Sequence, residues 1–302
     1  MLTRLLSLAL MPCLVFSVGA QTVEWTFPTD SMPQSPTLYP DTAHPTGVLV
    51  TAGKTLTLLS GRGEVQWTGP FDEYIAGAVT AANLDGTETS IVLGLQTGAV
   101  ICLNADGKER WTFPAESPEK GTTLIAVADV HPSQGMEIIF GRMGGWLHCL
   151  SAEGQELWRF FGDPFRVGHC TVGDADGDGF AEILYGTDNG NMYCLTGLGQ
   201  VKWRYTEQAP YGRSGVNLAD LNGDGHAKVL VTRSNAGRKV CLTSLDGATG
   251  AFEWRTADMM QSYVSNATVD LDGDGKLEVL HGDKGNYLYC TNPDGSERWR
   301  TT

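Results

Sequence analysis

Three short acidic stretches combine residue types and spacing that suit calcium binding. In the stretch that begins at Asp174, three aspartates alternate with other residues, a glycine follows at the sixth position and a glutamate comes at the ninth. In a calcium loop the alternate side chains point inward, the glycine permits a sharp turn, and the carbonyl of the seventh residue supplies another oxygen. Three carboxylates within five residues repel one another unless a cation lies between them. The predicted ligands are Asp174, Asp176, Asp178, the carbonyl of Phe180 and Glu182.

The other two stretches are variants of the same loop. One is a full copy, and the other has Lys228 at its ninth position, which opposes a second cation nearby and predicts a weaker site. An EF-hand loop closes with a glutamate at position twelve, so these loops belong to another class. The competing interpretation is that the Asp and Gly residues only form turns. The predicted ligands are Asp270, Asp272, Asp274, the carbonyl of Lys276 and Glu278 in the full copy, and Asp220, Asn222 and Asp224 in the weaker one.

Two residues outside these loops are candidates for ligand contact. Trp146 follows two glycines and lies outside the spacing of the other tryptophans, so its ring either meets a ligand or packs within a loop. His169 lies at the start of a predicted inner strand, but no partner carboxylate is evident for it. The sequence has no pattern of a serine hydrolase elbow, a zinc protease helix, a haem attachment site or a phosphate loop. We therefore predict no catalytic residue.

A repeat in tryptophan predicts the elements that position these residues. Seven tryptophans recur at spacings of 42 to 51 residues, and six of them have a glycine four residues earlier. A period of this length is typical of propellers and related arrays. Asp-Gly and Glu-Gly pairs before several of the tryptophans favour hairpin turns. The seven are Trp25, Trp67, Trp111, Trp158, Trp203, Trp254 and Trp299.

Each repeat contains short apolar runs bounded by turn residues, and no window shows the apolar periodicity of a helix. Four antiparallel strands in about 45 residues match one propeller blade. We predict an all-β chain in which residues 21–302 form a single β-propeller domain of six complete four-stranded blades, with one extra N-terminal strand at Val23–Phe27. The alternative is an incomplete seven-bladed ring. A closed ring of six is preferred because an open ring exposes apolar surface and strand edges.

Six cysteines follow residue 20, which in an exported protein would suggest three disulfides. Five of them occupy the same place in successive repeats, and such positions in neighbouring blades are too far apart for a disulfide. We predict buried free thiols at these five positions. They are Cys102, Cys149, Cys194, Cys241 and Cys290.

Residues 1–20 have the pattern of a secretory signal peptide. Arg4 precedes an apolar run from Leu5 to Val18, and small residues lead to a predicted cleavage near Ala20. The apolar run is too short to span a bilayer easily. We expect a secreted or periplasmic protein without a membrane span. The net charge of -14 argues against nucleic acid and anionic membranes as partners, because both attract basic surfaces.

Two patterns resemble known families. The loop followed by Glu-Ile-Leu at Glu182 resembles the FG-GAP (VCBS-type) repeats of integrin α-chains and bacterial secreted propellers, although the Phe-Gly-Gly-Ala-Pro segment is absent. The pattern Cys-Leu-x-x-x-Gly-x-x-x-Trp, as at Cys194–Trp203, resembles the tryptophan-docking repeats of quinoprotein-like (PQQ-like) propellers. The resemblance implies a propeller with Ca²⁺ in its loops, and a propeller does not imply one function.

From these observations we predict a non-enzymatic, calcium-stabilised module that binds or scaffolds an extracellular protein or carbohydrate, and we expect a monomer. One alternative is a quinone-dependent dehydrogenase; PQQ is not expected, because the sequence offers no convergent set of acidic, Asn and Arg residues to hold it. The other is a polysaccharide-active enzyme, which would need basic and aromatic residues gathered on one rim.

Overall fold

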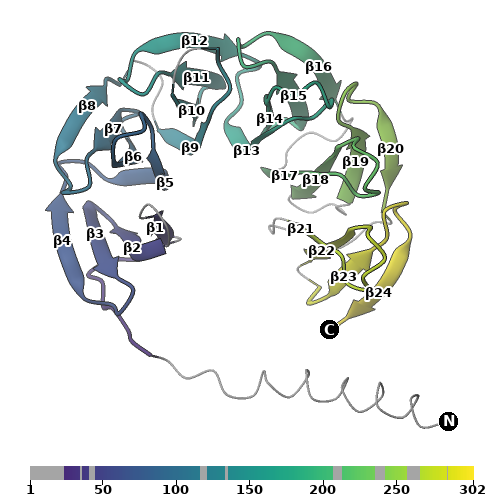
Figure 1. The fold of residues 1–302 in the computed structure, drawn as a ribbon, viewed down its shortest axis with the longest axis horizontal. Coiled ribbons are helices and arrows are strands. Elements are labelled where there is room, and N and C mark those ends of the chain that lie inside the picture. The colour runs from purple at the N-terminus through teal and green to yellow at the C-terminus, as the bar shows by residue number, and fades with distance from the viewer. Residues whose placement is uncertain are drawn as a thin grey trace.

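The computed structural model describes residues 24–34, 36–40, 45–115, 121–132, 135–206, 213–234, 242–256, 266–283 and 285–302. The predicted signal peptide lies outside them. The described chain forms six four-stranded sheets, each built from four consecutive strands, and neighbouring strands within a sheet are antiparallel. The sheets follow one another round an arc like blades, with the first strand of each on the inside and the fourth on the outside (Figure 1). We number them blade 1 (β1–β4) to blade 6 (β21–β24).

The strands occupy equivalent places in the six blades. The first, innermost strands are β1 (Thr37–Pro40), β5 (Ile75–Asn83), β9 (Thr122–Ala128), β13 (Val167–Gly173), β17 (Arg213–Ala219) and β21 (Ala267–Val269). The second strands are β2 (Pro45–Ala52), β6 (Thr89–Leu95), β10 (Glu137–Arg142), β14 (Glu182–Thr187), β18 (Lys228–Ser234) and β22 (Glu278–Gly282). The third strands are β3 (Thr55–Ser60), β7 (Val100–Leu103), β11 (Trp146–Leu150), β15 (Asn191–Leu195), β19 (Leu242–Asp246) and β23 (Leu288–Thr291). The fourth, outer strands are β4 (Val65–Pro70), β8 (Glu109–Phe113), β12 (Glu156–Phe161), β16 (Val201–Thr206), β20 (Phe252–Arg255) and β24 (Glu297–Thr301).

The prediction of an all-β propeller with six four-stranded blades is confirmed. The described residues contain no helix long and apolar enough to cross a bilayer. The predicted N-terminal strand differs in detail: residues 24–27 have no strand pairing, and Val23 lies outside the described residues.

The apolar core lies between the blades rather than within them. The second strands are apolar on both faces, and β14 is buried along its whole length. Ile183 and Tyr185 pack against blade 3, whereas Leu184 packs against blade 5. Burying each such side chain stabilises the fold by about 1.5–3 kcal/mol. Each blade therefore depends on its neighbours for its core.

The regular tryptophans join one blade to the next. The indole of Trp158 in blade 3 donates a hydrogen bond of 2.8 Å to the carbonyl of Gly197 in blade 4 and lies against Gly199, where a Cβ would come within 2.7 Å of the ring. Gly199 also has a φ of 75°, a conformation that glycine adopts without strain. The glycine four residues before each Trp is thus the seat of the Trp from the preceding blade. The seated pairs are Trp25–Gly63, Trp67–Gly107, Trp111–Gly154, Trp158–Gly199, Trp203–Gly250 and Trp254–Gly295.

The arc is open. Blades 1 and 6 are its two ends, and their described strands lie apart (Figure 1). Within the described residues the six blades therefore do not form the closed ring that the sequence analysis preferred, and the alternative of an incomplete ring describes their arrangement better. Trp299 at the free end of blade 6 is 38% exposed, whereas its blade 4 counterpart Trp203 is 8% exposed. At the other end, Trp25 occupies the seat on blade 1 that a preceding blade's Trp would take.

The repeat cysteines that the structure describes are free, as predicted. Cys102, Cys149, Cys194 and Cys290 are buried, and Cys241 lies outside the described residues. Burial raises the pKa of the Cys102 thiol to about 11, so the thiol stays protonated at neutral pH.

Candidate functional site

The acidic loop of blade 4 joins β13 to β14 and is shaped by hydrogen bonds to its own backbone. The carboxylate of Asp174 accepts hydrogen bonds from the amides of Gly177 and Gly179, at 2.7 and 2.9 Å. Asp178 accepts one from the amide of Phe180 at 2.8 Å. Gly177 and Gly179 have φ values of 78° and 88°, in the left-handed region that glycine favours. These bonds fix the turn of the loop.

The predicted ligands come together only in part. Oxygens of Asp174, Asp176 and Glu182 lie within 4.8 Å of one another, as do those of the equivalent residues in blade 6. The third aspartate of each loop is not in these groups. Phe180 is exposed, and its backbone carbonyl is the one oxygen that it could offer to a cation. The blade 6 set is Asp270, Asp272 and Glu278.

A lysine lies among the carboxylates of blade 4. The ammonium of Lys202 forms an ion pair with Asp176, lies 2.9 Å from Oε1 of Glu182, and lies 3.6 Å from Oδ2 of Asp178. Desolvation lowers the pKa of Lys202, but the hydrogen bonds to Asp176 and Glu182 outweigh it, so the pKa is raised and the charge is kept. The chain therefore supplies its own counter-ion to this loop.

Arginines have the same place in two other blades. In blade 6 the guanidinium of Arg298 bridges Glu278 at 2.7 Å and Asp272 at 2.5 Å. The hydrogen bond from Arg298 lowers the pKa of Asp272. In blade 2 Arg110 pairs with Asp85 at 2.6 Å, where the acidic loop is reduced to little more than this aspartate.

Blade 5 has the opposite arrangement. Lys228 takes the ninth position of the loop, and Glu253 on β20 takes the place of Lys202. Their ion pair measures 2.6 Å, and the hydrogen bond that Lys228 donates to Glu253 raises the pKa of Lys228. The Asp220 carboxylate still accepts hydrogen bonds from its own turn, the shortest at 2.7 Å from the amide of Gly225, and this bond contributes most to lowering its pKa. The loop keeps its shape while the ion pair beside it is reversed.

A bulge in each outer strand brings these side chains to the loop. In blade 4 Cys194 pairs with Trp203 and Leu195 pairs with Val201, so Lys202 is an extra residue between them. Such a bulge redirects a side chain that regular alternation would point elsewhere. The same register shift lies beside Arg110, Glu253 and Arg298.

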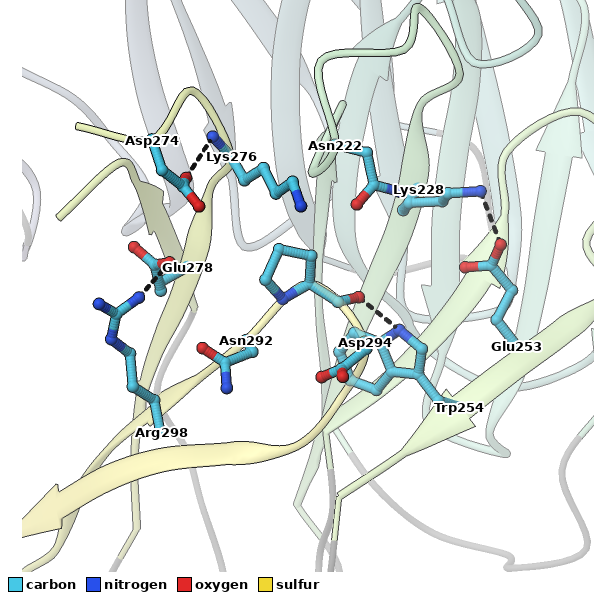
Figure 2. Close-up of a pocket in the computed structure, with 11 residues that line it drawn as sticks. Asn222, Lys228, Glu253, Trp254, Asp274, Lys276, Glu278, Asn292, Asp294 and Arg298 are labelled. Atoms are coloured by element: carbon cyan, nitrogen blue, oxygen red, sulfur yellow. Dashed lines mark hydrogen bonds and ion pairs between the residues drawn. The ribbon is translucent and has the colours of Figure 1, made fainter. Parts of the chain in front are cut away.

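Two pockets of similar construction lie between blades. One, of about 660 Å³, is formed by the loops of blades 3 and 4 and includes Phe180, Leu198 and Lys202. The other, of about 460 Å³, lies between blades 5 and 6 and includes Asn222, Lys276 and Asp294. In Figure 2, Lys276 extends toward the space between the loops, and Lys228 turns away toward Glu253.

Trp146 and His169 are not among the acidic residues that converge in the loops. Trp146 is half-buried at the start of β11, with its ring 5.0 Å from Phe161 and the Arg159 guanidinium 5.3 Å from its ring centre. These contacts support the interpretation that Trp146 packs locally. His169 is exposed on the innermost strand β13, beside a register shift between Val167 and Cys170. The two do not form one site with the loops.

The loops of blades 4 and 6 fit a small cation by the chemistry of their donors. Each gathers three carboxylates, two aspartates and a largely buried glutamate, and oxygen donors of this kind suit Ca²⁺. That a positive side chain already lies among them shows that each place attracts a cation. The sequence analysis missed Lys202, Glu253 and Arg298. The signal that identifies them is their position directly before a docking Trp.

Comparisons with known proteins support a repeat propeller. A family model described as an FG-GAP-like repeat matches residues 174–231, from the acidic loop of blade 4 into β18 of blade 5. No curated protein matches the chain.

Two solved structures have a similar fold. The computationally designed Ika8 protein is 13% identical, with a TM-score of 0.64 over 90% of this chain and 73% of that chain. BamB from Moraxella catarrhalis is 14% identical, with a TM-score of 0.51 over 90% of this chain and 91% of that chain. At these identities the likeness concerns the fold alone. With the repeat match, it identifies the chain as a β-propeller repeat protein.

Proposed function

We propose that this propeller is a secreted or periplasmic, non-enzymatic binding or scaffold module, stabilised by Ca²⁺, for an extracellular protein or carbohydrate. The observation that carries the proposal is the variation at the seventh position of three otherwise similar loops. The residues there are Phe180, His226 and Lys276, and all three side chains are exposed. The three loops have the same turn but present different groups: an aromatic ring, an imidazole and an ammonium. Such a surface is suited to recognition, because the backbone shape stays the same from loop to loop while the contact chemistry varies.

The surroundings of these side chains favour ligand contact. Phe180 lies at the pocket between blades 3 and 4 together with Leu198, which is 50% exposed. Lys276 lies at the pocket between blades 5 and 6, beside the amides of Asn222 and Asn292. An exposed aromatic side chain and amide groups beside a concave surface suit a sugar ring or a peptide segment.

A binding experiment tests the proposal. The triple variant Phe180→Ala, His226→Ala, Lys276→Ala would be compared with the wild type on an array of neutral and uronate-containing oligosaccharides. Met143→Ala is the matched control, since Met143 is 51% exposed on a turn at the other end of the strands. We expect at least tenfold weaker binding for the triple variant only. Equal binding by the triple variant and the wild type would contradict the proposed surface.

The calcium part of the proposal has its own measurement. Extracellular calcium modules have dissociation constants of about 10⁻⁴ to 10⁻³ M, so at about millimolar Ca²⁺ each site would add roughly 1 kcal/mol to stability. We expect a lower melting temperature in excess chelator than in about millimolar Ca²⁺. An unchanged melting temperature would count against structural calcium.

The non-enzymatic part is tested by adding PQQ, the cofactor that the dehydrogenase alternative would require. Purified protein would be incubated with the quinone, Ca²⁺, an alcohol and a redox dye, and no dye reduction above background is expected. Dye reduction that depends on the protein would replace the binding proposal with a dehydrogenase. Release of unsaturated sugars from a uronate polymer would replace it with a polysaccharide lyase.

A further inference from the structure

The Lys202 ammonium faces the same oxygens that a calcium ion in blade 4 would need. It contacts Asp176 and Glu182 directly and lies 3.6 Å from Asp178. Asp176 and Glu182 are two of the three residues whose oxygens converge in this loop. Two positive charges cannot share these oxygens without strong repulsion at such short distances. A calcium ion and the lysine are therefore competitors.

Blade 6 repeats the competition with a different cation. Arg298 holds Asp272 and Glu278, again two of the three converging residues. The guanidinium engages both with separate nitrogens in a fixed planar fork. The Arg298 side chain is 32% exposed, compared with 21% for Lys202. Water can therefore solvate the guanidinium when it moves away from the carboxylates.

Blade 5 supplies the contrast within the same chain. There the ninth position is Lys228, and its ion pairs are with Glu253 and Asp246 on β20 and β19. The ninth residue adds no carboxylate to this loop, and among the described residues the loop does not belong to a group of three converging acids. Neutralising Lys228 should therefore leave the acidic loop of blade 5 without a new calcium ligand.

We propose that Lys202 and Arg298 are alternative counter-ions to Ca²⁺ and set the calcium affinity of their own loops. Calcium binds in blade 4 or blade 6 only when the side chain withdraws, and it binds more weakly than it would to the same carboxylates alone. This inference rests on the calcium part of the proposed function. It assigns to the residues before Trp203 and Trp299 the role of tuning the metal sites of blades 4 and 6.

The test is calcium titration by calorimetry on the full chain, with Lys202→Met, Arg298→Met and the matched control Lys228→Met. Methionine keeps an apolar stem of similar length while removing the charge. We expect the Lys202→Met and Arg298→Met variants each to gain at least tenfold in affinity at one site. The control loses a nearby positive charge but frees no loop carboxylate, so its gain should be much smaller. Lys202→Gln, which is neutral but still donates hydrogen bonds, is the second variant should methionine unfold the blade.

Each outcome decides the proposal. A calcium affinity in the neutral variants equal to or below that of the wild type overturns it, and so does an equal gain in Lys228→Met. If the wild type binds Ca²⁺ and the variants bind equally, only this inference fails. If neither binds Ca²⁺, structural calcium in the proposed function fails with it, while the ligand surface of Phe180, His226 and Lys276 is untouched.

Discussion

Blades 4 and 5 share their strands, their bulge and their tryptophan seat, yet the ion pair beside their acidic loops has opposite polarity. In blade 4 an acid at the ninth loop position meets Lys202, and in blade 5 Lys228 meets Glu253. Both pairs join the start of the second strand to the bulge of the outer strand. Blades 4 and 5 thus place complementary charges at these two positions, and the charges occur in either order. The ninth residue of the loop belongs to this pair as much as to a metal site.

The largest expected effect on stability comes from reversing the charge of Lys202 in blade 4. Lys202→Glu places a further carboxylate beside Asp176 and Glu182, and we expect the free energy of unfolding to fall by about 3 kcal/mol, as for a broken, largely buried ion pair. Adding Glu182→Lys recreates the order of blade 5 and should recover at least half of that loss. The check is the urea midpoint of the wild type, the single variant and the double variant. A double variant no more stable than Lys202→Glu would show that polarity is not interchangeable.

A smaller loss of stability is expected from changes at the glycine seats, which blades 4 and 5 have in common. Gly199→Ala and Gly250→Ala each force a Cβ against a seated indole, at 2.7 and 2.5 Å, and should lower stability by about 2 kcal/mol each. Gly179→Ala is the control, since its φ of 88° is equally unusual but no atom lies within 4 Å of the added Cβ. That change should cost only about 1 kcal/mol of backbone strain. Equal losses at all three positions in thermal denaturation would contradict the seating role.

The smallest effect extends the comparison to blade 6, where His281 takes the place of Tyr185 in blade 4. Burial lowers the pKa of His281 to about 4, and the nearby Asp283 carboxylate opposes this shift. The imidazole stacks on Tyr289 and bonds to Thr291.

Because the folded-state pKa of His281 is below its ordinary value of about 6.5, the unfolded chain binds the proton more readily. The stability from this group is therefore complete above pH 6.5 and is lost as pH falls toward 4. Between pH 7.5 and 5.5 the loss should be about 1 kcal/mol. His281→Phe should remove this part of the pH dependence in urea denaturation. An unchanged slope in the variant would assign the pH dependence to other groups.

The features that repeat along the chain could be predicted from the sequence. The offset of four residues between Gly and Trp, and the apolar runs before them, predicted the strands and their order. The turn of each acidic loop followed from the aspartates and glycines, because these contacts are local. The convergence of Asp174, Asp176 and Glu182 was predicted for the same reason.

Three features could not be predicted from such local patterns. The seat of Trp158 is Gly199, one blade further along, so its own glycine four residues earlier gave no hint of the contact. Lys202 is the extra residue of a bulge between Val201 and Trp203, and the sequence does not reveal where such a bulge directs a side chain. Closure of the ring depends on how blades 1 and 6 approach one another, and no short stretch of sequence encodes that relation.

The tryptophan seats make each blade dependent on its immediate neighbours, and this gives unfolding a direction. In such an array the free energy is nearly a sum over units and the contacts between adjacent units. Blade 1 has its outward seat filled by Trp25, whereas among the described residues Trp299 of blade 6 has no seat to fill. Opening should therefore begin at blade 6 and pass inward one blade at a time. The slowest amide exchange would then lie in blades 1 and 2, which are farthest from blade 6.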